Sequence, residues 1–166
     1  MAALLRLIDS FNKWLTILLG IVLGIMSIVI ISQVLSRYIF GIPLPWSEEL
    51  ARYLMSYSVF VGAALALRKQ QLIAVEFISE RLSWKPRRVL KIAVNIIGIL
   101  LFAILFMKGL EMMGKVSTQL SAGMQIPMSI PYASIPIGAA LLTMNVVAVI
   151  IELVLSKEEV KEGEVA

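Results

Sequence analysis

The stretch "WLTILLGIVLGIMSIVIISQVLS", residues 14–36, contains no charged side chain. A helix of about 20 apolar residues crosses a hydrocarbon core about 30 Å thick, so this stretch is long enough to span a membrane. The rest of the chain is similarly apolar, since 60% of the 166 residues are hydrophobic and only 16% are charged. Its mean hydropathy of +0.93 lies well above that of ordinary soluble domains. The sequence therefore predicts an all-α integral membrane protein.

Three further apolar stretches predict membrane-spanning helices at about residues 45–67, 91–113 and 131–155. Together with residues 14–36 they form four expected spans within a single membrane domain, residues 1–166. The first span is too long for the apolar core of a usual signal peptide, and no small-residue cleavage site follows it. We therefore expect it to remain in the protein.

The orientation follows from the positive charges, which are concentrated between the second and third expected spans. The residues concerned are Arg68, Lys69, Arg81, Lys85, Arg87, Arg88 and Lys91. Lysine and arginine accumulate in cytoplasmic loops. With an even number of spans, both termini are then expected in the cytoplasm. Because the basic residues flank spans and form no separate basic domain, we expect no nucleic-acid partner.

Two segments have the pattern of short amphipathic helices lying at the membrane surface. In residues 1–13 the apolar side chains share one helical face, and residues 70–88 combine an apolar face with a basic end. Ordinary connecting helices explain both segments equally well. The charged residues 156–166 are expected to form a frayed cytoplasmic tail.

The composition also excludes several chemistries. The chain has no cysteine and no histidine, so disulfides, thiol nucleophiles and zinc clusters are impossible, and no nucleophile–base pair can be assembled. We expect no enzyme and no cofactor. No expected span has a carboxylate near its midpoint, which a small proton-coupled exporter needs, and no internal repeat is visible. These absences argue against an autonomous pump.

The head of the second expected span carries a group of charges close to lipid: Glu48, Glu49 and Arg52, beside Trp46. Acidic residues in the first helical turn and an i,i+4 ion pair would explain them structurally. Docking of a partner subunit explains them as well, because charges in membrane proteins usually face protein or water. Both interpretations stay open at this point. Arg68 terminates the same helix.

Small and polar residues within the spans predict helix–helix contacts. Gly20 and Gly24 form a G-x-x-x-G pattern in the first span, and Gly62 offers a similar face on the second. These glycines are candidate subunit-interface residues, together with the residues around Trp46 and with Arg68. Asn95 and Asn145 are expected to make hydrogen bonds between helices and not to bind a ligand.

The stretch "PWSEELARYLMSYSVFVGAALALRKQQLIAVEF", residues 45–77, resembles the small, DctQ-like membrane subunit of tripartite ATP-independent periplasmic (TRAP) transporters. It shares with that family a Trp-x-Glu-Glu-x-x-Arg start, a Gly-Ala pair in mid-helix and a basic end. The stretch "STQLSAGMQIPMSIPYASIPIGAALL", residues 117–142, resembles the segment before the family's last helix. One departure is that Leu72 and Ile73 stand where the family often has a His-Ile pair.

This resemblance implies a scaffold subunit in a bacterial or archaeal cytoplasmic membrane, surrounded by lipid. It implies pairing with a large elevator-type membrane subunit, which holds the substrate and sodium sites, and a periplasmic binding protein that delivers a carboxylate such as a dicarboxylate or sialic acid. The candidate contacts with the binding protein are Lys115, Ser117, Gln119 and Gln125. The alternatives are an autonomous four-helix transporter and a subunit of another tripartite carboxylate system.

Overall fold

The computed structural model describes residues 2–69 and 84–163, and these residues form helices joined by short loops. The helices are α1 (Ala2–Ile39), α2 (Pro45–Arg68), α4 (Trp84–Lys115), α5 (Ser129–Tyr132) and α6 (Ser134–Gly163). Among the described residues, four helical segments are long and apolar enough to cross a membrane, and there are no strands. The predicted all-α fold with four spans is confirmed.

The helix boundaries differ from the expected ones at both termini. α1 is continuous from Ala2 to Ile39, without a break between residues 1–13 and the first span. α6 continues through most of the predicted tail to Gly163, since its lysine and glutamate residues favour a helix. Interfacial placement of residues 2–13 stays a prediction. Residues 70–83 of the second expected interfacial segment lie outside the described residues, and α4 begins at Trp84.

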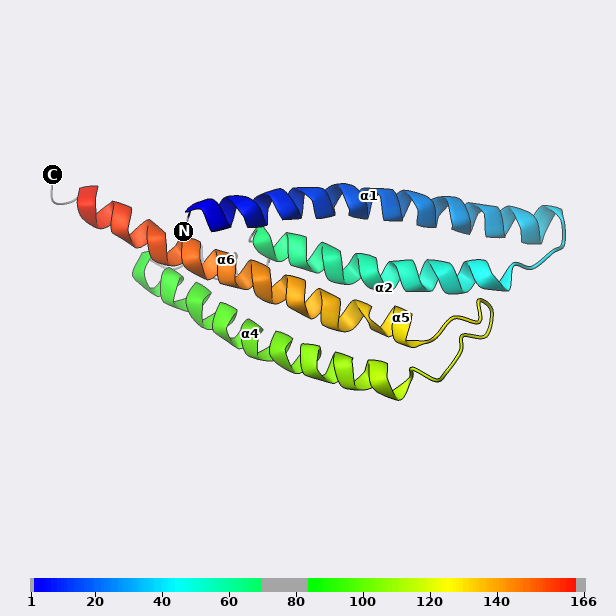
Figure 1. Ribbon diagram of the computed structural model, residues 1–166. Helices are drawn as coiled ribbons and strands as arrows, with labels where there is room; N and C mark the ends of the chain where they lie inside the picture. Colours follow the sequence, from blue (N-terminus) through cyan, green and yellow to red (C-terminus); the bar gives the residue numbers. More distant parts are fainter. Residues whose placement is uncertain (1, 70–83, 164–166) are drawn as a thin grey trace.

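The long helices lie in one open layer, in the order α1, α2, α6, α4 (Figure 1). α1 packs against α2, α2 against α6, and α6 against α4, whereas α1 and α4 make no contact within the described residues. Half of the span in α6 is buried, against 6% of the span in α1 and none of that in α4. α6 is therefore the centre of the fold, and the two flanking helices offer apolar surface to their surroundings.

Both chain termini lie at one end of the layer, and the α1–α2 turn and the α4–α5 loop lie at the other (Figure 1). The α1–α2 turn contains Gly41, whose φ of 66° lies in the left-handed region that glycine adopts without steric cost. Pro45 then begins α2, at a position where its missing N–H costs nothing. The turn therefore returns the chain to run back along α1.

The core lies where α2 and α6 meet, and its buried residues are Ala64, Leu67, Leu142, Val146 and Val149. Glycines bring the helices of this core close together. A Cβ added to Gly138 would collide with the Phe60 side chain, and one added to Gly109 would lie 2.8 Å from Pro136 Cδ. Small residues at such contacts let helix backbones approach closely in membrane proteins. The sequence pattern singled out other glycines, so these two were missed.

Gly138→Ala should destabilise the fold, because the added methyl group cannot fit beside Phe60 without moving α2 or α6. Overpacking of this kind costs about 1–3 kcal/mol. Thermal unfolding in mild detergent should show a lower midpoint. Gly98→Ala is the matched control, since its added Cβ would make only an ordinary 3.6 Å contact with Phe102. Equal midpoints for the two variants would contradict the close α2–α6 contact.

Candidate functional site

Glu49 fastens the α4–α5 loop, residues 116–128, to the head of α2. The backbone N–H groups of Gly123 and Met124 donate hydrogen bonds of 2.9 Å to Glu49 Oε1 and Oε2, respectively. Both carboxylate oxygens are thus used within the chain, and hydrogen bonds to a charged acceptor are stronger than neutral ones. A Cβ at residue 123 would lie 3.1 Å from the Pro45 carbonyl oxygen, so the loop backbone approaches α2 closely at this glycine. We call this contact the Glu49 latch.

The same loop is also ordered by its own hydrogen bonds. The Ser121 N–H donates to the Ile126 carbonyl and the Met128 N–H to the Gln119 carbonyl, both at 2.9 Å. Gln125 has a φ of 55°, which is uncommon for a residue with a side chain. Its side-chain amide donates to the Ser121 and Ala122 carbonyls, at 2.9 and 3.1 Å. The loop therefore has a defined conformation, held by its own hydrogen bonds.

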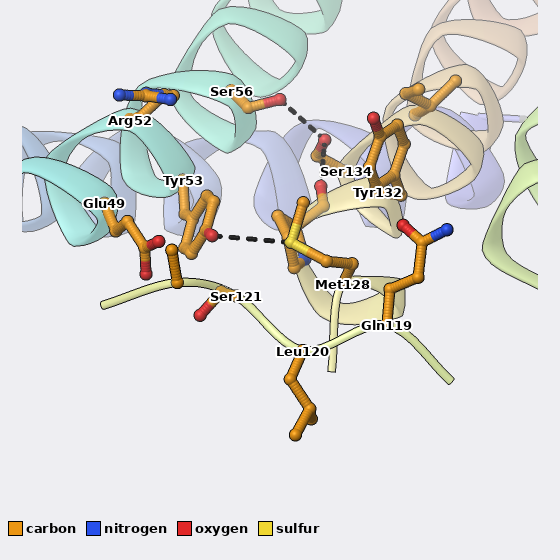
Figure 2. A pocket seen from close by; sticks show the side chains of 13 residues that line it. Glu49, Arg52, Tyr53, Ser56, Gln119, Leu120, Ser121, Met128, Tyr132 and Ser134 are labelled. Atoms are coloured by element: carbon orange, nitrogen blue, oxygen red, sulfur yellow. Dashed lines mark hydrogen bonds between the residues drawn. The ribbon is translucent and has the colours of Figure 1, made fainter. Parts of the chain in front are cut away.

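A cleft of about 510 Å³ lies between α2, this loop, α5 and the start of α6. Figure 2 shows its wall, in which the Tyr53 hydroxyl donates to Met128 Sδ at 3.6 Å and the Ser56 and Ser134 hydroxyls share a hydrogen bond of 2.8 Å. Tyr53, Ser56 and Ser134 thus make hydrogen bonds within the wall of the cleft. The Leu120 side chain points away from Tyr53 and Met128 (Figure 2).

Glu48 does not contact the loop as its neighbour Glu49 does, and instead forms an ion pair within α2. It pairs with Arg52 four residues on, at 3.2 Å, and both side chains are about two-thirds exposed. Such exposed pairs contribute little to stability. Trp46 is also exposed. The structure therefore assigns Glu49 to an internal contact, whereas Trp46, Glu48 and Arg52 remain on the surface, and a partner contact for them stays a prediction.

Arg68 ties three helices together at the end of the layer that holds the termini. Its guanidinium donates to Asp9 Oδ1 of α1 at 2.9 Å and to Glu152 Oε2 of α6 at 2.7 Å. The arginine side chain is only 11% exposed, while its two acidic partners are more open. The sequence singled out Arg68 as a candidate interface residue, and the structure places it in contact with its own chain.

A buried amide pair lies next to this ion cluster. Asn12 of α1 donates to Asn145 Oδ1 of α6 at 2.7 Å, and Asn145 donates to the Ala64 carbonyl of α2 at 2.8 Å. The prediction that Asn145 bonds between helices is confirmed. For Asn95 it is wrong, because the Asn95 side chain donates to the Lys91 carbonyl in its own helix. Asp9 and Asn12 were missed, although their i,i+3 spacing places both near one helical face.

The candidate glycines fall into two groups. A Cβ on Gly20 or Gly24 would meet no atom within 4 Å, so their face of α1 is open. A Cβ on Gly62 would lie 3.8 Å from Leu19 Cδ2, so Gly62 belongs to the contact between α1 and α2. Only Gly20 and Gly24 remain available for a neighbouring chain.

The candidate contacts with a soluble partner lie at the α4–α5 loop. Lys115 and Lys108 both pair with Glu111, at 2.7 Å each, so two cations share one carboxylate just before the loop. Ser117 and Gln119 are exposed, whereas the Gln125 amide is used inside the loop. Within the described residues, no cluster of acidic side chains could hold a metal ion.

The chain is similar to known transporter components. Residues 25–156 match the family model of the DctQ component of tripartite ATP-independent periplasmic transporters. The chain is 32% identical over 105 residues to the sialic acid TRAP transporter permease protein SiaT of Haemophilus influenzae, covering 62% of this chain and 16% of that protein. It is 36% identical over 64 residues to the sialic acid TRAP transporter small permease protein SiaQ of Vibrio cholerae, covering 39% of this chain and 37% of that protein.

A third relative is the isethionate TRAP transporter permease protein DctMQ of Oleidesulfovibrio alaskensis. The identity is 27% over 136 residues, covering 75% of this chain and 21% of that protein. This chain therefore spans less than half of the length of each of these three relatives.

Arg68→Gln should destabilise the protein, because Asp9 and Glu152 lose their shared cation near the buried amide pair. Hydrogen bonds to charged groups contribute about 1.5–3 kcal/mol each. We expect a lower thermal midpoint in detergent. Lys69→Gln removes an adjacent, exposed charge and should leave the midpoint unchanged. Equal thermal midpoints for the two variants would show that the contacts of Arg68 with Asp9 and Glu152 do not stabilise the fold.

Glu49→Gln should loosen the α4–α5 loop, because a carboxamide offers one acceptor oxygen where two N–H groups need one each. A spin label on Ala122→Cys reports this directly, since the chain has no other cysteine. Its electron paramagnetic resonance spectrum should show higher mobility in the Glu49→Gln background. Glu48→Gln is the matched control and should leave the spectrum unchanged. Equal mobility in both backgrounds would argue against the latch.

Proposed function

Since the chain belongs to the DctQ component family of tripartite ATP-independent periplasmic transporters, the small permease subunits of these systems, we propose that it is a fixed scaffold for a larger membrane subunit. The complex takes up an organic acid, driven by sodium, after a periplasmic binding protein delivers it. Two relatives are named for sialic acid, a carboxylate, and one for isethionate, a sulfonate. An organic anion is their common chemistry, and a carboxylate remains our proposed substrate class.

The open layer of helices is the observation that carries this proposal. A carrier that works alone needs a path between its helices, whereas α1 and α4 do not contact each other within the described part of the chain and enclose nothing. The charged side chains described in the spans lie toward the ends of the helices and not at their midpoints. Ion coupling within a span normally uses an ionisable residue inside the membrane. A scaffold needs neither feature.

We assign the contact with the large subunit to the open face of α1 and the head of α2. Gly20 and Gly24 leave room for a partner helix on α1, where Ile17, Ile21 and Ile28 are exposed. At the head of α2, Trp46 and the Glu48–Arg52 pair are exposed as well. Helices in membranes associate through small residues that allow close packing. The remaining apolar faces contact membrane lipid.

The orientation with both termini in the cytoplasm places the α4–α5 loop on the periplasmic side. The positive charges from Arg68 at the end of α2 to Lys91 in α4 support this orientation. Lys115, Ser117 and Gln119 then face the compartment of the binding protein. Gln125 contributes indirectly, because its amide holds the loop in shape.

A pull-down of the tagged chain in mild detergent, followed by mass spectrometry, tests the scaffold role. We expect a large membrane subunit in equal amount. Recovery of the small chain alone, together with transport by this chain in liposomes, would instead establish an autonomous transporter. A partner from another tripartite carboxylate system would reassign the family of the complex but not the scaffold role.

Gly24→Leu should weaken the pairing, because the larger side chain fills the open face of α1. We expect association with the large subunit to be about tenfold weaker, which corresponds to about 1.4 kcal/mol. Gly114→Leu is the control, since residue 114 is equally open but lies on α4. Recovery of the large subunit measures both. Loss in the Gly114 variant alone would move the interface to α4.

A further inference from the structure

An apolar groove of about 530 Å³ lies between the N-terminal part of α1 and α6, at the end of the layer that holds both termini (Figure 1). Its walls are formed by Leu7, Ile8, Ser10, Phe11, Trp14 and Met144. Leu7 and Trp14 are 69% and 59% exposed, so the apolar surface is open to the surroundings. Apart from the Ser10 hydroxyl, the side chains of the groove suit a long apolar group.

A basic edge runs beside this groove. Arg6, Ser10 and Lys13 follow one another at i, i+4 and i+7 on α1, so they share a helical face, and Ser10 also lines the groove. Both basic side chains are exposed, and neither forms an ion pair with another described residue. We call Arg6 and Lys13 the two cations of the groove.

The acidic side chains nearby do not cancel these two charges. Of the acidic side chains that the structure describes, Asp9 and Glu152 lie at this end of the layer, and both bond to Arg68. That group of three has one negative charge left over, which the adjacent, exposed Lys69 matches. The two cations of the groove therefore remain as an excess of positive charge.

A groove at the other end of the layer also contains two basic residues, but its charges are paired. This groove, of about 460 Å³, is lined in part by Lys108 and Lys115 of α4. Both lysines form ion pairs of 2.7 Å with Glu111. The cations beside α1 are thus better placed for an anionic ligand, and the two lysines of α4 provide a matched control.

The groove beside α1 lies where phospholipid headgroups meet acyl chains. Lys13 is the last charged residue before the charge-free residues 14–36, and tryptophan, here Trp14, favours this interface. In the orientation proposed above, this is the cytoplasmic leaflet, whose anionic lipids attract basic residues. Basic pockets between membrane helices on the cytoplasmic side bind anionic headgroups. The position and the charge of the groove therefore both fit an anionic phospholipid.

Bulky side chains distinguish this groove from the face of α1 that we assign to the large subunit. On that face, Gly20 and Gly24 leave room for a partner helix. In the groove, Phe11 and Trp14 are large and exposed, which keeps a helix backbone at a distance. A flexible acyl chain can follow such an uneven surface.

We propose that the groove binds one anionic phospholipid of the cytoplasmic leaflet. Arg6 and Lys13 pair with the headgroup phosphate, and the Ser10 hydroxyl donates a hydrogen bond to it. One acyl chain lies along Phe11 and Trp14 toward the centre of the membrane. The inference takes its leaflet from the proposed orientation and does not depend on pairing with a large subunit.

Native mass spectrometry of the purified chain tests the site, with phosphatidylglycerol or phosphatidylcholine added in mild detergent. The wild type should bind phosphatidylglycerol more tightly. Arg6→Gln combined with Lys13→Gln should weaken this binding about tenfold, because both cations are lost. Lys108→Gln combined with Lys115→Gln is the matched control and should bind as the wild type. Equal binding of the two lipids to the wild type would overturn the proposal.

The fluorescence of Trp14 tests where the lipid lies. Trp46→Phe and Trp84→Phe together leave Trp14 as the only tryptophan of the chain. In nanodiscs, brominated phosphatidylglycerol should quench Trp14 more strongly than brominated phosphatidylcholine at the same mole fraction. This difference should vanish when Arg6 and Lys13 are replaced by glutamine. A difference that persisted in that variant would contradict the role of the two cations.

The same mass measurement on the complex with the large subunit separates this inference from the proposed function. Phosphatidylglycerol binding that still depends on Arg6 and Lys13 supports the lipid site. Loss of that binding in the complex would show that the large subunit covers the groove, which overturns the lipid site and leaves the scaffold role intact. Binding by the chain alone, with no large subunit recovered, would overturn the scaffold role and support the lipid site.

Discussion

The contact between α2 and α6 is the constraint on which the rest of the structure depends. The two helices run in parallel, and α2 meets α6 at four successive positions one turn apart, Ser56, Phe60, Ala64 and Arg68. Their partners on α6 are Ser134, Gly138, Asn145 and Glu152. Lipid offers little hydrophobic gain for bringing two helices together, so close packing and hydrogen bonds must do so. The contact between α2 and α6, here called the seam, combines close packing with hydrogen bonds along its length.

The seam also explains why the layer stays open. α2 and α6 bury their facing surfaces against each other, and α1 and α4 then add to the two outer edges. Among the described residues, the polar side chains that fix α1 to other helices lie at one end, where Asp9 and Asn12 reach Arg68 and Asn145. Farther along α1 the contact is apolar, and its opposite face, with Gly20 and Gly24, meets nothing. An open edge of this kind suits a subunit whose remaining neighbours come from another chain.

Much of the fold could be predicted from sequence, because each span is a local property of composition. Charge-free runs and their lengths predict the spans whatever their neighbours are. The polar contacts could not be predicted in the same way, since they join residues far apart in the chain. Asp9 lies off the apolar face of residues 1–13, and only the three-dimensional arrangement brings it to Arg68. Similarly, no pattern shows that Gly138 packs on Phe60 and Gly20 on nothing.

The pair Glu48 and Glu49 shows this limit most sharply. As neighbours in the first turn of one helix, they share the same helix dipole and the same distance to lipid, so sequence treats them alike. Their helical positions differ by about 100°, which turns Glu48 to solvent and Arg52, and Glu49 to the loop. The partners of Glu49 are backbone N–H groups, which leave no trace in the residue types of the loop except for Gly123. A carboxylate whose position suits a partner subunit equally well is therefore used within the chain.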